Sequence, residues 1–287
     1  MHKFVLNNER LLKMLAMMLI ILSGITLYLK PLNFGIEFTG GVVIETAMTG
    51  EELQNSDIFS IIGVSVDASD YGSTIKVAQS EEGFVPEMKA FIGSELLSEE
   101  VIGASLGQEM VDASIQSIAI ALIAMSLYLA IRYNLLMAFA AIFALVMDLT
   151  VSLGFLSLIG LEFNTLIVGA MMTVIGYSIN DSVVTLDKVR EVKRARQGED
   201  IGDLYKTIVD VIFKRTMITS SSTLLVLLAL ALFGGNELSG FAITLGIGVM
   251  SGTLSSLVVV LAICSWASKR NPEFIKFNKK PSMEGDL

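Results

Sequence analysis

The chain has 287 residues, of which 53% are hydrophobic and only 17% are charged, and its mean hydropathy is +0.68. This composition excludes an ordinary soluble domain and is typical of a protein that crosses a membrane several times. A single cysteine, Cys264, excludes an intrachain disulfide, and a single histidine, His2, excludes a histidine-based metal site or a Ser/His nucleophile. The net charge of −9 has a meaning only once the charges are placed along the chain.

Six apolar stretches have about the length that a helix needs to cross a bilayer, although the second and the fifth are short. They are Leu11–Leu29, Ile115–Ile131, Leu135–Ile159, Phe163–Val184, Met217–Phe233 and Phe241–Trp266. The first stretch runs directly into Lys30 and Pro31 without a small-x-small cleavage site, so we expect a membrane span rather than a cleaved signal peptide.

The basic residues predict the orientation. Of the 20 lysines and arginines, 17 fall in the two terminal tails, the connection between spans two and three, and the connection between spans four and five. The positive-inside rule makes this side cytoplasmic, so a multi-pass protein of the cell membrane with both termini in the cytoplasm is predicted. Basic clusters can also bind lipid headgroups or nucleic acid, but topology accounts for them here, and we expect no nucleic-acid partner.

After a tail and first span at residues 1–29, residues 30–112 are predicted to form one extracytoplasmic domain, with 15 acidic residues and 3 lysines. Its acidity suits a solvated surface or a cationic partner. The predicted elements are a strand at Phe34–Thr46, a helix at Thr49–Ile62, two strands at Val64–Ala68 and Thr74–Ala78, a helix at Pro86–Leu97 and a strand at Glu100–Gly103. This order predicts an α+β domain of the ferredoxin-like type inserted into a membrane α-helical bundle.

The rest of the chain is predicted to be a five-span bundle at residues 113–266 and a cytoplasmic tail at 267–287. Ser105–Glu109 has the composition of a turn, a hinge or a plain linker. The connection 189–215 has apolar residues at helical intervals, which suits a helix lying on the inner membrane surface. In the sixth span, Gly248 and Gly252 form a GxxxG surface for close packing, either inside the bundle or against a second subunit.

An aspartate interrupts the fourth span, where a charge costs about 2.5–3.5 kcal/mol on insertion scales. That residue is Asp181. Small and polar residues share its region of the helix, and we expect them to face a neighbouring helix rather than lipid. They are Gly169, Thr173, Gly176, Tyr177, Ser178 and Asn180. The pattern predicts an ionisable site that works inside the membrane, with a structural polar contact between helices as the alternative.

A second aspartate, Asp148, lies about 20 Å into the third span, whereas Asp181 lies about 9 Å from the inner boundary of the fourth. Arg215 immediately precedes the fifth span. Because a nearby cation favours the charged form of a carboxyl group, alternating contact between Asp181 and Arg215 would load and release a proton.

Five segments resemble the SecF family of the SecD/SecF protein-export subunits, in the order and spacing of that family. They are NFGIEFTGG (33–41), ASLGQEM (104–110), MDLTVSLGFLSLIGLEFNTLIV (147–168), IGYSINDSVVTLDKVRE (175–191) and KRTMITSSSTLL (214–225). Glu37 and Ala104 stand where aspartate and proline are common in the family, and neither touches the proton site.

The resemblance implies membership of the resistance-nodulation-division superfamily, six spans, a ferredoxin-like external domain and a complex with SecD. In the family, the positions of Asp181 and Arg215 are implicated in proton-coupled motion, and Asp148 matches an acidic position of less certain role. The complex helps unfolded preproteins leave the Sec translocation channel. A transport subunit rather than an enzyme is therefore expected, without a cofactor. The resemblance favours H⁺ as the coupling ion, and the residues alone do not distinguish H⁺ from Na⁺.

Two other functions share some of these features. An intramembrane aspartyl protease also needs two membrane aspartates, but VMDLT and INDSV lack its Gly-x-Gly-Asp setting and the two depths differ. A small-molecule or lipid exporter of the same superfamily would also have six spans and one external domain in each half. The external domain of about 80 residues leaves little room for a drug-binding cleft.

Overall fold

The computed structural model describes residues 9–49, 53, 64–69, 72–78, 83, 85–196 and 201–270. Six helices in these ranges are long and apolar enough to cross a membrane. They are α2 (Glu9–Leu29), α6 (Ala104–Arg132), α7 (Leu135–Ile159), α8 (Thr165–Ala195), α9 (Ile201–Phe233), and α10 (Gly235–Ser255) continued by the π-helical η4 (Ser256–Val260) and by α11 (Leu261–Arg270). The predicted membrane α-helical fold is confirmed.

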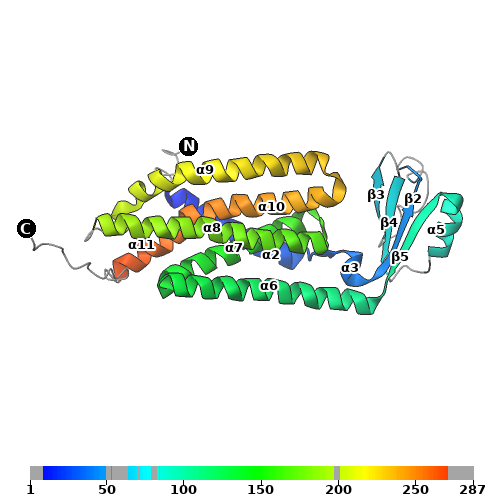
Figure 1. The fold of residues 1–287 in the computed structure, drawn as a ribbon, viewed down its shortest axis with the longest axis horizontal. Helices are drawn as coiled ribbons and strands as arrows, with labels where there is room; N and C mark the ends of the chain where they lie inside the picture. The colour runs from blue at the N-terminus through cyan, green and yellow to red at the C-terminus, as the bar shows by residue number, and fades with distance from the viewer. Residues whose placement is uncertain are drawn as a thin grey trace, which may run out of the picture.

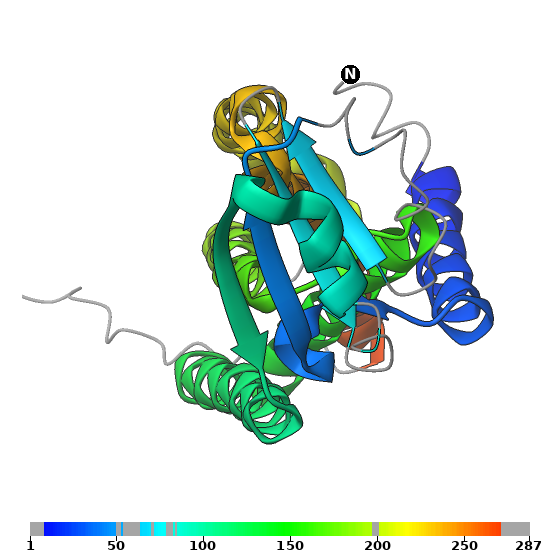
Figure 2. The same cartoon turned by 90° about the vertical axis from the view of Figure 1, so that its right-hand side faces the viewer.

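The small α+β domain lies at one end of the helical bundle, and α2 begins and α11 ends at the other (Figure 1). Its elements are α3 (Ile36–Thr39), β2 (Gly41–Thr46), β3 (Val64–Ser69), β4 (Gly72–Ala78), α5 (Val85–Ile92), η3 (Gly93–Glu95) and β5 (Leu96–Ile102). The sheet order is β3-β4-β2-β5, and each neighbouring pair is antiparallel. Figure 2 shows α5 on the face of the sheet that points away from the bundle.

Alternating apolar residues of β2 and β4 pack under α5. Val42, Ile44, Ile75 and Val77 form a core with residues of α5 that include Met88. The strand order and α5 agree with the predicted domain, and the predicted hairpin is present as β3 and β4. The first predicted helix, Thr49–Ile62, lies outside the described residues except for Thr49 and Leu53, so the ferredoxin-like assignment itself stays a prediction.

Two predicted elements of this domain are wrong. The strand expected at Phe34–Thr46 is divided into β1 (Asn33–Phe34), α3 and β2. Gly40 follows α3 and Gly41 begins β2, with φ values of 76° and 154° that side-chain-bearing residues rarely adopt. The helix expected to reach Leu97 ends at η3, and β5 then begins at Leu96.

The expected turn at Ser105–Glu109 is instead the first part of α6. Gly107 allows α6 to approach α3 closely, because a Cβ atom at this position would lie 2.8 Å from the backbone oxygen of Phe38 in α3. The small residue therefore packs α6 against the external domain's entry segment rather than making a turn.

The surface helix expected within 189–215 is also absent as a separate element. Residues 201–215 are the first part of α9. Ile201, Leu204, Ile208 and Ile212 are buried in the main core of the bundle, so the apolar face of this segment packs on protein rather than on lipid.

The buried centre of the bundle is made by α7, α8 and α10, while α2, α6 and α9 are more exposed. Asn134 and Asn164 begin α7 and α8 by accepting hydrogen bonds from the backbone nitrogens of Met137 (2.9 Å) and Ile167 (3.0 Å). Gly160 ends α7 in the left-handed conformation, with φ 73°. The short connection after Gly160 carries β6 (Glu162–Phe163), which pairs in parallel with β1.

Contact between α8 and α10 depends on the predicted glycine surface. A Cβ atom at Gly248 would overlap the side chain of Val174, which is fully buried. At Gly246 the nearest neighbour is Leu224 Cδ2 at 3.8 Å, an ordinary contact. Of the two interpretations, Gly248 therefore serves packing inside the bundle.

We expect Gly248→Ala to lower the free energy of unfolding in mixed micelles by about 1–3 kcal/mol, because the new methyl group overpacks the α8–α10 contact. Gly246→Ala is the matched control, since it gains the same helix propensity of about 1 kcal/mol without a clash. Equal unfolding free energies for the two variants would contradict this packing.

Candidate functional site

Asp148 of α7 is fully buried and accepts three hydrogen bonds from serine hydroxyl groups. Ser178 of α8 donates to Oδ2 at 2.6 Å. From α10, Ser251 donates to Oδ1 at 2.6 Å and Ser255 to Oδ2 at 2.8 Å. Hydrogen bonds that donate to a carboxylate stabilise its charged form, so this cage suits an ionised Asp148.

The α10 backbone can lie close to Asp148 because Gly252, between the two serines, has no side chain. A Cβ atom at Gly252 would lie 3.5 Å from both Asp148 Oδ2 and Ser178 Cα. Ser251 and Ser255 are four residues apart and therefore share one face of the helix. The predicted packing glycine Gly252 thus lies inside the polar site itself.

Directly after Ser255, the sixth span changes to π-helical geometry at Ser256–Val260. Single π-helical turns inside α-helices are rare and are frequent at functional sites. The change in winding places a non-standard backbone segment next to the Asp148 cage.

Asp181 of α8 is also buried, with an exposed fraction of 4%, but its surroundings are different. Its Oδ2 atom has no hydrogen-bond partner among the described residues, and neither do Ser182 Oγ and Thr185 Oγ1. These residues occupy one side of α8, because Thr185 lies one turn after Asp181. Buried polar atoms of this kind are normally satisfied, so the three oxygens form an acceptor-rich site fit for water or a small cation.

Arg215 of α9 is exposed, and its charge acts on Asp181. No ion pair within 4.0 Å joins the two residues, although the structure describes both. Asp148 and Asp181 also lie close enough to influence each other electrostatically. The three predicted residues, Asp148, Asp181 and Arg215, therefore lie close enough for their charges to interact. Asp181 and Arg215 are not in direct contact in this structure.

The predicted supporting residues divide into two groups. Ser178 binds Asp148, and Tyr177 Oη lies 3.2 Å from Thr223 Oγ1 of α9. Asn180, in contrast, is exposed. Two further residues of the predicted stripe, Gly169 and Gly176, are exposed, and nothing lies within 4 Å of a Cβ atom built on either. The expectation that this stripe faces another helix is wrong for the helices of this chain.

The sequence did not identify Ser182, Thr185, Ser251 and Ser255 as part of the site. The two serines of α10 lie beside the glycines of the predicted packing surface, and no polar role is predicted for them. Their four-residue spacing was the available signal, since it allows two hydroxyl groups to reach one carboxylate. No group of three or more His, Cys, Asp or Glu side chains fit to hold a metal ion occurs in the part of the chain that the structure describes.

Comparison with known proteins identifies the family. Residues 86–270 match the family described as protein export membrane protein SecD/SecF, C-terminal, and residues 25–49 match the SecD/SecF GG motif. The chain belongs to the SecD/SecF family. The glycine pair Gly40–Gly41, whose φ values are positive, lies in the segment that carries the GG motif.

Similar SecD/SecF proteins cover most of the chain. It is 30% identical to the protein translocase subunit SecF of Rickettsia rickettsii, over 96% of this chain and 93% of that protein. It is 32% identical to the protein translocase subunit SecF of Calditerrivibrio nitroreducens, over 88% and 90%. The family resemblance stated from the motifs is thereby confirmed.

The solved structures of SecDF are longer than this chain. A crystal structure of SecDF from Thermus thermophilus has a TM-score of 0.76 and 27% identity, and the match covers 90% of this chain and 37% of that one. SecDF in a super-membrane-facing form gives a TM-score of 0.72 and 27% identity, over 93% and 39%. The chain therefore spans less than half the length of the SecDF chains that it matches.

We expect Ser251→Ala to lower the unfolding free energy in mixed micelles by about 1–2 kcal/mol, because Asp148 loses one of its donors. Ser221→Ala, at an exposed position of α9, is the matched control and should change stability little. If the two variants were equally stable, the serine cage would not hold Asp148.

Proposed function

We propose that this member of the SecD/SecF family is a SecF-type subunit that couples the transmembrane proton gradient to protein export. The observation that carries the proposal is the contrast between the two buried carboxyl groups. Asp148 is surrounded by three hydroxyl donors, whereas Asp181 Oδ2 has no hydrogen-bond partner in the described part of the chain. One carboxylate suits a fixed charge, and the other suits a changing one.

Protonation of Asp181 would change the free-energy cost of burying its side chain in the bundle. The charged form is costly in a dry interior and is favoured when Arg215 or water approaches. Transfer of one charge across the membrane supplies about 2.3 kcal/mol per 100 mV of potential. This free energy would drive a rearrangement of α8 and α9 between two states. In one state Asp181 would be open to one side of the membrane, and in the other state to the opposite side.

A homologous six-span partner, expected to be SecD, would cover the exposed stripe of α8. Gly169, Thr173, Gly176 and Asn180 are exposed at helical spacing, and the two glycines have no neighbour within 4 Å of a Cβ position. Small residues on a membrane helix allow a second helix to approach closely, and Asn and Thr side chains can hydrogen bond to it. The stripe borders Asp181, so a partner at this position would complete the walls of the ion site.

The orientation follows from charge. The ends of the bundle that carry most basic residues are placed in the cytoplasm, and the acidic α+β domain is placed outside. The complex would there assist unfolded preproteins that leave the Sec channel, with H⁺ as the coupling ion. The relatives from Rickettsia rickettsii and Calditerrivibrio nitroreducens are both protein translocase subunits, which favours this function over a small-molecule or lipid exporter of the same superfamily.

We expect Asp181→Asn to abolish proton-driven export in membrane vesicles while preserving membrane insertion and partner association, because an amide cannot bind and release a proton. Asp112→Asn, an exposed carboxyl residue of α6, is the matched control and should keep export normal. Normal gradient-dependent export by Asp181→Asn at equal protein level would overturn the proposal.

We expect Gly176→Leu to reduce co-purification of the partner subunit by about tenfold, a loss of about 1.4 kcal/mol, because the side chain blocks close helix approach. The isolated chain should keep its stability, since the position is exposed and has open space around it. Gly24→Leu, at an exposed position of α2 that also has nothing within 4 Å of its Cβ position, is the matched control for added bulk. Undiminished co-purification would show that the stripe is not the partner surface.

A further inference from the structure

Lys76 is a lysine of the external domain that is buried between the sheet and the membrane helices. In β4, Ile75 and Val77 face the core under α5, so strand alternation turns Lys76 to the opposite face of the sheet. Its side chain is only 7% exposed. A lysine this buried is kept in place by acceptors.

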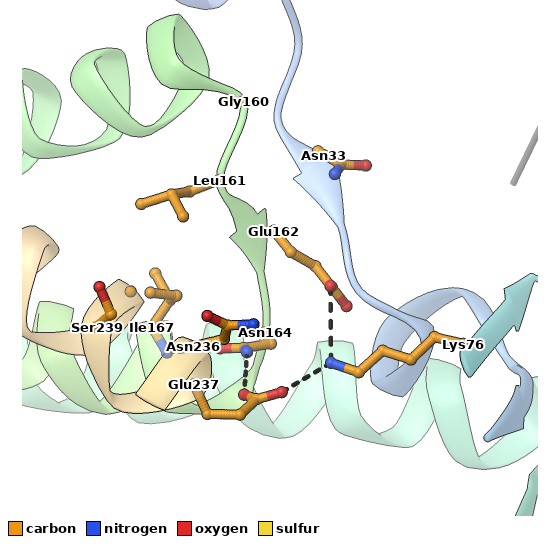
Figure 3. Close-up of a pocket in the computed structure, with 11 residues that line it drawn as sticks. Asn33, Lys76, Gly160, Leu161, Glu162, Asn164, Ile167, Asn236, Glu237 and Ser239 are labelled. Carbon is orange, nitrogen blue, oxygen red and sulfur yellow. Dashed lines mark hydrogen bonds and ion pairs between the residues drawn. The ribbon is translucent and has the colours of Figure 1, made fainter. Parts of the chain in front are cut away.

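Two carboxylates that Lys76 contacts in the described part of the chain belong to the outer end of the bundle. Lys76 Nζ lies 2.8 Å from Glu237 Oε1 and 3.7 Å from Glu162 Oε2 (Figure 3). Glu237 is in the first turn of α10, and Glu162 is on β6, between α7 and α8. One ammonium group therefore joins the external sheet to the ends of separate membrane elements.

The contact continues from Glu237 into α8. Glu237 Oε2 accepts a hydrogen bond from Asn164 Nδ2 at 3.0 Å, and Asn164 Oδ1 caps the first turn of α8 (Figure 3). Thus Lys76 is linked to α10, which carries two of the serines on Asp148, and to α8, which carries Asp181. The link runs through hydrogen-bonded side chains rather than through apolar packing.

The surroundings allow this link to open. A cavity of about 360 Å³ lies beside it, bordered by Asn33, Asn236 and Ser239 among other residues. Glu237 is 47% exposed and Glu162 is 24% exposed, so water can solvate both carboxylates when Lys76 withdraws. Gly40 and Gly41 join α3 to β2, and α3 packs on α6 at Gly107, so this segment attaches the sheet to the bundle.

We propose that Lys76 is the positioning residue that docks the external domain on α8 and α10, and that its ion pairs break when these helices shift. The domain then turns about its two covalent attachments, Gly40 and Gly41 between α3 and β2 and Gly103 between β5 and α6. That proton coupling drives the shift of α8 and α10 rests on the proposed function, whereas the docking by Lys76 does not.

The docking is tested by a distance measurement on the full-length chain. Spin labels are placed at two exposed positions, Ser94 of η3 in the external domain and Phe233 at the outer end of α9, in a Cys264→Ala background. Double electron–electron resonance in lipid nanodiscs, without a gradient, then reports the position of the domain. The wild-type pairs should give one narrow distribution.

Lys76→Met should broaden this distribution and shift it, and Glu237→Lys should do the same. Lys76→Arg should keep the narrow distribution, because it retains the cation that both Glu237 and Glu162 contact. The matched control is Lys89→Met, which removes a lysine whose partner, Glu99 at 2.6 Å, lies in the same domain. It should leave the distribution unchanged.

The proposal is overturned if Lys76→Met leaves the distribution narrow, if Lys89→Met broadens it equally, or if Lys76→Arg broadens it as much as Lys76→Met in a folded protein. In export assays with the partner subunit and the channel, Lys76→Met should reduce gradient-driven export by about 2- to 30-fold, the range expected for coupling residues. Normal export by Asp181→Asn would refute the proton mechanism while leaving the distance result intact, so the two failures are distinguishable.

Discussion

The hydrogen bonds from three serine hydroxyls to Asp148 are the interaction on which the bundle depends. A carboxylate at the crossing of α7, α8 and α10 would be costly without donors. The α10 face solves this problem and the packing problem together. Gly248 and Gly252 let α10 approach α8, and Ser251 and Ser255 on the same helix then reach Asp148. The hydrogen bonds to Asp148 therefore depend on the close packing of α10 against α8.

With Asp148 satisfied, Asp181 becomes the exceptional residue. Its Oδ2 atom and the hydroxyls of Ser182 and Thr185 are buried without partners among the described residues. Two carboxyl groups in one bundle thus have environments suited to different roles, one fixed and one exchangeable. Two of the helices around these carboxyl groups, α8 and α10, meet the external domain at their outer ends through Asn164, Glu237 and Lys76. Continuous helices therefore connect the proposed ion site with the proposed docking contact.

Much of the fold could be predicted because each long apolar stretch has one physical solution in a membrane, and because strand alternation at Thr74–Ala78 is strong. The errors occur where tertiary contacts decide. Gly40–Gly41 divides a strand-like segment by its backbone conformation, Gly107 continues a helix where a turn is expected, and Ile201–Ile212 packs on the bundle rather than on lipid. In each of these three segments, the observed and the expected structure have the same local hydrophobic pattern, so the pattern cannot distinguish them.

The charged members of the site could be found in the sequence, because an aspartate inside an apolar span is rare and costly. Their partners could not. Serine and threonine are common on membrane helices, and only the crossing of α7 with α10 shows that Ser251 and Ser255 bind Asp148 rather than their own backbone alone. Likewise, Lys76 is an ordinary lysine of an acidic domain until the sheet is placed against α10.

Infrared difference spectroscopy of the reconstituted chain tests the division of roles most directly. When the pH is changed, a carboxyl C=O band should appear on protonation, vanish in Asp181→Asn and persist in Asp148→Asn, because only Asp181 exchanges its proton. A band that persists in Asp181→Asn and vanishes in Asp148→Asn would contradict the account.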